Sequence, residues 1–285
     1  MGDIFSGLES MGLGSLSNMS IYDEDKKESH SGNGGSKPQE QVMSEADYIF
    51  DKKMQCPVCN SEFKVKAVKT GKARLIGSDS DLRPKYAGID SIKYDAIVCP
   101  NCGYAALSRF FSYMTSIQAR FIREGITAHF KKLPETGDIY TYDEAISRYK
   151  LALLNSVVKK AKNSERAYTC LKIAWLYRGK KENLPADTPN YNAVKVECDK
   201  NELEMINNAY AGFLTSRDKE DYPICGMDEA TFDYLIADLA NRVGQYEVSE
   251  KMAATVIMSR AASGRIKEKA RDLREEVKKK LAKKA

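Results

Sequence analysis

The sequence has little histidine, no long hydrophobic run and no strong excess of one charge. Its two histidines are His30, in a polar segment, and His129, in an expected helix, which argues against a catalytic metal held by histidines. No apolar run approaches the roughly 20 residues that a membrane-spanning helix needs. The N-terminus lacks the basic and compact apolar regions of a secretory signal. The net charge of +5 does not by itself indicate nucleic-acid binding. We therefore expect a soluble globular protein with no membrane association.

Cysteine is the first informative residue type that is present. Without an export signal, seven cysteines indicate a reducing compartment, where thiols bind metals more often than they pair. Four of them form two C-x2-C units separated by 39 residues. The other three are scattered singly and are expected to be ordinary helix or loop residues: Cys170, Cys198 and Cys225.

Both units have the sequence of a zinc knuckle, "CPVCN" at 56–60 and "CPNCG" at 99–103. Proline after the first cysteine suits the first corner of a turn. Asn60 and Gly103 follow the second cysteines, and these residue types most readily adopt a positive φ, which turns backbone N–H groups toward the sulfurs. The two knuckles together supply the four ligands of a closed site. We predict one structural Zn²⁺ with these ligands: Cys56, Cys59, Cys99 and Cys102.

Two other interpretations of the cysteines compete with a structural zinc. A thioredoxin-like redox pair needs its C-x-x-C where a strand ends and a helix begins, within a βαβ unit, and the first pair lacks that setting. A catalytic zinc needs an open coordination position, usually with histidine or carboxylate ligands. With only two histidines in the chain, the four-thiolate site is the better interpretation.

The sequence around the knuckles predicts a zinc-ribbon-like domain over residues 46–110. Residues 63–69 alternate apolar side chains with lysines, the period of a half-buried strand. Residues 92–99 alternate in the same way and lead into the second knuckle. Residues 70–91, between these strands, are rich in Gly, Asp and Ser and are expected to form a long loop.

The chain after the second knuckle has the pattern of helices. Thr141 and Glu144 have the spacing of a capping box. Residues 230–244 place apolar side chains at helical intervals, and Gly244 ends this helix before another begins at Gln245. Further helices are expected near residues 164–180, 200–216 and 265–283, the last being basic.

Two helical segments resemble tetratricopeptide repeats (TPR). Small and aromatic residues occupy the repeat's close-packing positions at Ala145, Tyr149, Ala152, Ala237 and Ser249. The spacing between the segments departs from the usual period of about 34 residues. We predict a degenerate, TPR-like antiparallel array with a basic C-terminal helix over residues 111–285. The expected fold class is therefore α+β, mainly α, with the small β zinc-ribbon module first.

The order of the motifs resembles a known bacterial family. "CPVC", "DSDLRP" and "YDAIVCPNCGYAA", followed by helices, are similar to the proteins grouped as domain of unknown function 2225, over roughly residues 48–260. The resemblance implies a zinc-ribbon head on a TPR-like helical body in a cytoplasmic bacterial protein, with the four cysteines as metal ligands. It implies no activity. Residues 1–45 lie outside it, and their polar, Gly- and Ser-rich composition predicts a flexible N-terminal tail and linker.

Three functions are compatible with these features. In the first, the protein is a non-catalytic adaptor whose helical array binds an unidentified protein partner. Tyr149 and Trp175 are candidate contact positions, with burial in the core as the alternative. In the second, the ribbon binds RNA or single-stranded DNA, with tyrosines Tyr86, Tyr94 or Tyr104 stacking on bases. Its basic contacts would be Lys64, Lys66, Lys69, Lys72 and Arg74.

The third hypothesis is an enzyme. Asp79 and Asp81, beside Arg83, are candidates for holding Mg²⁺ or for acid–base chemistry. The alternative is that these aspartates form turns and pair with a nearby arginine. The chain has no phosphate loop, nucleophile elbow or histidine-centred triad. The sequence leaves the oligomeric state open.

Overall fold

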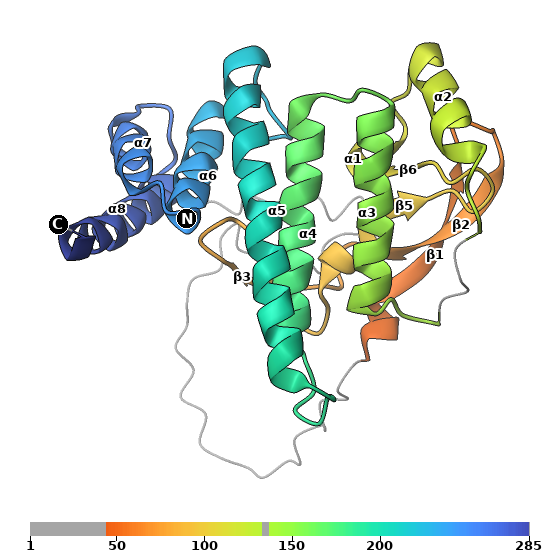
Figure 1. Cartoon of the computed structure of the whole chain (residues 1–285), viewed down its shortest axis with the longest axis horizontal. Helices are drawn as coiled ribbons and strands as arrows, with labels where there is room; N and C mark the ends of the chain where they lie inside the picture. The colour runs from red at the N-terminus through yellow and green to blue at the C-terminus, as the bar shows by residue number, and fades with distance from the viewer. Residues whose placement is uncertain (1–43, 133–136, 285) are drawn as a thin grey trace, which may run out of the picture. The chain divides into compact units, whose positions relative to one another are not determined.

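A computed structural model describes residues 44–132 and 137–284 (Figure 1). They lie in one compact unit, assigned to residues 43–285. The predicted tail and linker over residues 1–45 fall almost wholly outside the described residues. The predicted domain boundary at residue 110 stays a prediction.

The β structure consists of three separate antiparallel pairs of strands. In the described residues, each pair is a two-stranded sheet with no third strand. The pairs are β1 (Ile49–Gln55) with β2 (Glu62–Val68), β3 (Leu75–Ser78) with β4 (Pro84–Tyr86), and β5 (Ala96–Val98) with β6 (Ala105–Leu107). Sheets this small have little stability alone, so all three depend on packing, and β1–β2 and β5–β6 each also have a knuckle between their strands.

The strand predictions are right for β2 and partly wrong elsewhere. The segment expected as a strand over 92–99 begins as a short 3-10 helix, η4 (Ser91–Tyr94), because the Asp90 side chain accepts a hydrogen bond from the Ile92 N–H. Only its second half forms β5. The segment expected as a long loop contains the β3–β4 hairpin, whose strands are too short to show a clear alternation.

Helices make up most of the described residues, which confirms the mainly α, α+β fold class. Short helical segments are η3 (Glu45–Tyr48), α1 (Ser108–Phe111), α2 (Ser116–Ile122) and the π-helix η5 (Arg123–Thr127). Long helices are α3 (Tyr142–Val158), α4 (Asn163–Glu182), α5 (Tyr191–Lys219), α6 (Glu229–Arg242), α7 (Tyr246–Met258) and α8 (Gly264–Lys284). No helix in the described part of the chain combines the length and apolar character that a membrane span demands.

The sequence signals for the long helices are confirmed at their ends. Thr141 and Glu144 form the predicted capping box at the start of α3. Gly244 has a φ of +81° between α6 and α7, a conformation that glycine adopts without strain. The helix predicted near 200–216 is much longer: α5 has 29 residues. Since a TPR unit of about 34 residues holds two helices, α5 is too long for a regular repeat, and the TPR-like description stays a prediction.

The core lies between the long helices and the hairpins. Helices α3, α4 and α5 lie side by side, and α3 also packs on β5 and β6 (Figure 1). Tyr149 and Trp175 are buried in this core, with 0% and 3% of their surfaces exposed. The Tyr149 hydroxyl donates a 2.6 Å hydrogen bond to the Ile92 carbonyl. The structure thus favours the core alternative for both residues, and neither offers a surface for a partner.

Candidate metal centre

Each predicted knuckle is the turn of a β-hairpin. The first joins β1 to β2 and the second joins β5 to β6. Inside the turns, the Asn60 N–H donates to the Cys56 carbonyl at 2.9 Å and the Gly103 N–H donates to the Cys99 carbonyl at 3.1 Å. Both donors have a positive φ, 60° at Asn60 and 74° at Gly103, as the sequence predicts. The same local geometry therefore presents a pair of sulfurs at each hairpin tip.

The structure brings all four predicted ligands together. Their Sγ atoms lie within 4.8 Å of one another. The Cys56–Cys102 and Cys59–Cys99 Sγ···Sγ distances, each across the two knuckles, are both 3.6 Å. Cys59 is partly exposed, and the other three are buried. The cluster therefore lies at the junction of two hairpins rather than within one.

These distances fit a tetrahedral metal ion. Four sulfurs about 2.3 Å from a central zinc lie about 3.8 Å from one another. The two Sγ···Sγ distances of 3.6 Å are within a few tenths of an ångström of that value. Four cysteines fill all four positions of a tetrahedral ion, so the centre is closed and has no coordination position for a substrate. The residues present therefore fit a structural metal, and the cluster holds the components of a four-thiolate site.

The close approach of the thiols shifts the pKa of Cys102 and the pKa of Cys99 in opposite directions. Hydrogen bonds to Cys56 and Cys99, together with burial, raise the pKa of the Cys102 thiol. A hydrogen bond from Cys102 lowers the pKa of the Cys99 thiol. The thiolate is the form that binds a metal, and a bound cation stabilises thiolates on neighbouring ligands. Metal binding at this cluster therefore displaces protons, as is general for cysteine sites.

Two residues of the π-helix η5 hold the knuckles in place. The Arg123 guanidinium donates to the Val58 carbonyl of the first knuckle, at 3.0 Å from Nη2. The Thr127 hydroxyl donates to the Cys102 carbonyl of the second knuckle at 3.0 Å. Arg123 and Thr127 are four positions apart, so one helical turn contacts both hairpins. The sequence gives no signal for this clamp, because neither residue belongs to a motif.

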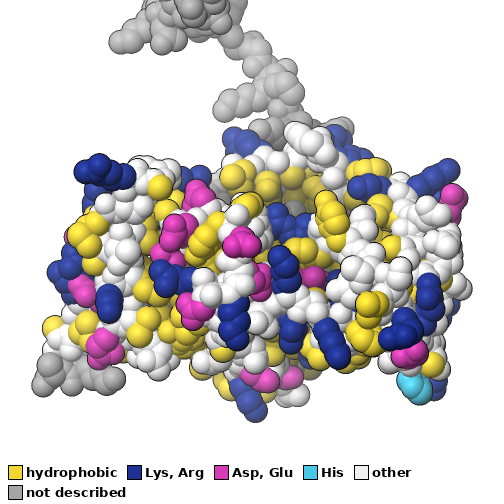
Figure 2. Space-filling model, turned by 90° about the horizontal axis from the view of Figure 1, so that it is seen from above, with side chains coloured by type: hydrophobic (Ala, Val, Ile, Leu, Met, Phe, Trp, Pro, Cys, Tyr) yellow, Lys and Arg dark blue, Asp and Glu magenta, His cyan; other side chains and the backbone are white. Residues whose placement is uncertain are grey.

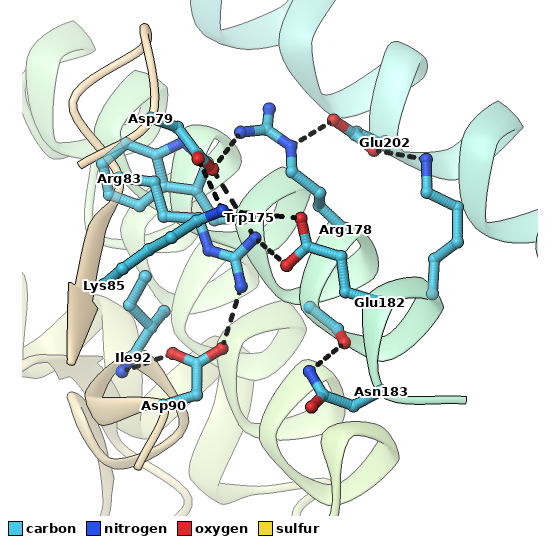
Figure 3. Close-up of polar contacts among 12 residues, drawn as sticks. Asp79, Arg83, Lys85, Asp90, Ile92, Trp175, Arg178, Glu182, Asn183 and Glu202 are labelled. Carbon is cyan, nitrogen blue, oxygen red and sulfur yellow. Dashed lines mark hydrogen bonds and ion pairs between the residues drawn. The ribbon is translucent and has the colours of Figure 1, made fainter. Parts of the chain in front are cut away.

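The predicted Asp79, Asp81 and Arg83 loop enters a largely buried ion network instead of an open site. Figure 3 labels Asp79 and Arg83 with their partners. Asp81, with none of its surface exposed, accepts hydrogen bonds from Trp175 Nε1 at 3.0 Å and Arg178 Nη2 at 2.6 Å. Asp79 accepts from Arg178 Nη1 at 3.0 Å. The two aspartates thus share one arginine of α4.

Arg83 links the network to two further carboxylates. Its guanidinium donates to Glu182 at 2.9 Å and to Asp90 at 3.3 Å (Figure 3). Burial alone would raise the pKa of Asp81, but the hydrogen bonds and positive charge of Arg178 outweigh burial and lower it. An ionised, fully paired carboxylate is a poor general acid or base at neutral pH. The loop therefore holds the β3–β4 hairpin against α4. This is the alternative in which the aspartates pair with an arginine instead of forming an active site.

The predicted basic contacts on β2 lie on its exposed face. Lys64 stands directly opposite Lys53 of β1, and Lys66 stands opposite Asp51. Like charges in direct register repel each other across a ribbon. This pair of lysines is therefore a local concentration of positive charge, whereas Lys66 faces an acidic neighbour.

The remaining basic candidates follow β2. Lys69 Nζ donates to the Asp47 carbonyl at 3.0 Å, while Lys72 and Arg74 are exposed in the turn before β3. On the face in Figure 2, basic and acidic side chains are interspersed among hydrophobic ones, and the coloured residues show no large area of one sign.

Most of the tyrosines predicted to stack on bases are buried. Tyr94 and Tyr104 are buried, and their hydroxyls donate to Glu45 at 2.7 Å and to the Phe111 carbonyl at 3.0 Å. Tyr86 alone of the three is partly exposed. Single-stranded nucleic acids bind largely by stacking bases on exposed aromatic rings. Two of the three candidate rings are thus unavailable for this role.

Comparison with known proteins places these features in a bacterial family. The sequence matches the family described as "Uncharacterized protein conserved in bacteria (DUF2225)" over residues 49–277. This range includes both knuckles, the ion network and all but the end of α8. The chain belongs to this family.

The chain is also similar to a curated bacterial protein. An "Uncharacterized protein" of Borreliella burgdorferi (strain ATCC 35210 / DSM 4680 / CIP 102532 / B31) is 27% identical over 53% of this chain. The chain spans 58% of that relative's length. No solved structure matches this chain.

Proposed function

We propose that this protein is a non-catalytic, zinc-binding adaptor that presents a helical surface to a protein partner. The four cysteines hold one structural zinc, and the metal joins two hairpins that have little stability of their own. The compartment that suits this role is a reducing one such as the cytoplasm, where cysteine thiols remain available to a metal. Elemental analysis distinguishes zinc from iron, which also accepts four thiolates.

The observation that carries the adaptor role is the outer face of α3. Here "outer face of α3" means Leu154 and Val157, whose surfaces are 52% and 50% exposed. Ala145, Tyr149 and Ala152, on the other side of the same helix, are buried. One isolated exposed leucine is ordinary. Two large apolar side chains within one helical turn form the kind of contact that a helical partner or groove covers.

The test is affinity capture from a bacterial lysate under reducing conditions, with and without nuclease. The double variant Leu154→Asp, Val157→Asp should lose the captured protein. Val196→Asp is the matched control, because Val196 is an exposed apolar residue on a different helix, α5. Capture should survive nuclease treatment and the control change. A partner retained equally by the double variant contradicts this assignment of the surface.

Nucleic-acid binding through the ribbon is the second candidate function. The observation that favours it is the Lys53–Lys64 pair, since two opposed lysines cost stability unless an anion lies between them. Affinity for an oligonucleotide would then fall steeply with salt, because each phosphate contact releases counterions. Changing Lys64, Lys66 and Lys69 together to Glu should abolish that binding and leave the zinc content intact. We expect this triple change to leave protein capture unaltered.

A further inference from the structure

A cavity of about 510 Å³ lies between the β1–β2 hairpin and α4. Its lining comes from β1, β2, the start of β4 and the segment before it, η4 and the following Asp95, the first residue of α1, and the middle of α4. The volume lies within the roughly 300–1,000 Å³ of sites that hold small molecules. The metal centre shares no residue with this cavity, and of the ion network's charged residues none lines it; Trp175, which donates to Asp81, borders both. The cavity is thus a separate structural feature.

Most of the lining is apolar or aromatic. Leu82, Ile92 and Val68 supply aliphatic surface, and Tyr168 and Trp175 supply rings from α4. Tyr168 and Trp175 meet edge to face, with centroids 6.4 Å apart. Mostly apolar walls with a few convergent polar groups are characteristic of small-molecule sites. The body of a ligand here would be aromatic or branched and apolar.

The polar end of the cavity is formed by Lys172, Asp95 and Ser108. Lys172 and Ser108 each donate a hydrogen bond to a different oxygen of Asp95, so the carboxylate is satisfied. The Lys172 side chain is 13% exposed, and its ammonium has three N–H donors. Within the described residues, Asp95 is its one hydrogen-bond acceptor, and the Tyr168 ring lies 4.8 Å from Nζ. Two donors of a largely buried cation therefore remain for a ligand oxygen.

The charges around the cavity also favour an anion. Lys52 and Lys172 against Asp95 leave one net positive charge in the lining. Lys52 lies on β1, and no carboxylate of the described residues pairs with it. An anionic ligand would gain contacts with both lysines, whereas a cation would meet an excess of like charge.

We propose that this cavity binds a small organic anion, an aromatic or branched apolar body that carries one anionic oxygen group. The body lies against Trp175 and the aliphatic residues, and the anionic group lies toward Lys172 and Lys52. The proposal is independent of the adaptor role, because the cavity does not include the outer face of α3.

The test uses the full chain with anilinonaphthalene sulfonate, a fluorescent aromatic monoanion. Trp175 is the one tryptophan of the sequence and lines the cavity, so its emission reports on binding. One probe per chain should quench this emission. Phenylnaphthylamine has the same rings without the sulfonate, and it should bind at least tenfold more weakly.

Neighbouring lysines on β1 provide a matched pair of variants. Lys52→Gln removes a charge from the cavity and should weaken binding about threefold to fivefold. Lys53→Gln removes the same charge from the residue paired with Lys64, outside the lining, and should leave affinity unchanged. Ala67→Phe fills the cavity and should abolish binding while zinc content and circular dichroism stay as in the wild type.

Several results would overturn the proposal. These are failure of the sulfonate probe to quench Trp175, equal affinity of the charged and neutral probes, or equal affinity of the Lys52→Gln and Lys53→Gln variants. Because Lys52 is exposed, its substitution preserves the fold. The comparison of the two lysines therefore remains decisive even if Ala67→Phe fails to fold.

Discussion

Replacing Asp81 by Asn should destabilise the protein strongly although the two side chains have nearly the same size. Asp81 is fully buried and accepts hydrogen bonds from Trp175 and from both terminal nitrogens of Arg178. Arg242 lies 3.7 Å from it. The amide keeps one acceptor oxygen but leaves the buried Arg178 without its main counter-charge. Arg178 retains only the contacts of its other partners, including Glu202 at 2.8 Å.

The expected loss follows from the cost of a broken buried ion pair. Removing one partner of such a pair costs about 3–5 kcal/mol, because the other charge stays buried without compensation. The remaining contacts of Arg178 with Glu202 and Asp79 place Asp81→Asn at the lower end, about 3 kcal/mol. The double change Asp81→Asn, Arg178→Met should cost at least as much as Asp81→Asn, because it also takes Arg178 away from Asp79 and Glu202.

The loss should also depend on pH. Arg178 holds the pKa of Asp81 below its ordinary value despite burial, which acts in the opposite direction. A lowered folded-state pKa contributes stability above the unfolded pKa of about 3.9, and this stability disappears as the pH falls through the folded value. The difference between wild type and Asp81→Asn should therefore be full at pH 7 and should shrink below about pH 4.

Urea unfolding followed by circular dichroism at pH 7 and pH 3 measures both effects. Asp199→Asn is the matched control, since Asp199 pairs with Lys181 on the surface and should change stability little. A loss of less than about 1 kcal/mol for Asp81→Asn at pH 7 would refute the role of the ion network. A loss that persists unchanged at pH 3 would refute its electrostatic origin.

Three other substitutions test the two knuckles and the core. Gly103→Ala should cost about 2 kcal/mol and should speed zinc loss to a chelator, because φ is +74° and the new Cβ would lie 2.4 Å from the Phe130 ring. Asn60→Ala, with only the strain of its φ of 60°, should cost about 1 kcal/mol, and equal effects at both positions would argue against the Phe130 contact. Tyr149→Phe should cost about 1 kcal/mol in urea unfolding by removing the 2.6 Å hydrogen bond to the Ile92 carbonyl, which keeps the Asp95 N–H at 3.3 Å as its other donor, and a neutral change would contradict the tyrosine hydrogen bond.

The sequence predicts local features of this fold well. The positive φ values at Asn60 and Gly103 and the capping box at Thr141 depend on residue types within a few positions, and the structure has them. The four-cysteine cluster could also be predicted from the sequence. Paired knuckles identify the four ligands whatever path the chain takes between them.

Features that depend on distant contacts are not visible in the sequence. The Asp79, Asp81 and Arg83 loop contains the residue types of an active site, but its partner Arg178 lies 97 positions after Asp81. The hydrogen bond from Arg123 to the Val58 carbonyl of the first knuckle likewise joins residues 65 positions apart. No local pattern distinguishes a buried ion network from an open acidic loop, so the structure is needed to decide between them.

Elemental analysis of the purified full-length chain tests the four-cysteine centre most directly. Protein prepared without added metal should contain close to one zinc per chain and no stoichiometric iron. Cys99→Ser should lose the zinc and the order of the β5–β6 hairpin, whereas the matched change Cys225→Ser, outside the cluster, should retain both. Full zinc retention by Cys99→Ser, or wild-type protein without zinc, would contradict the assignment.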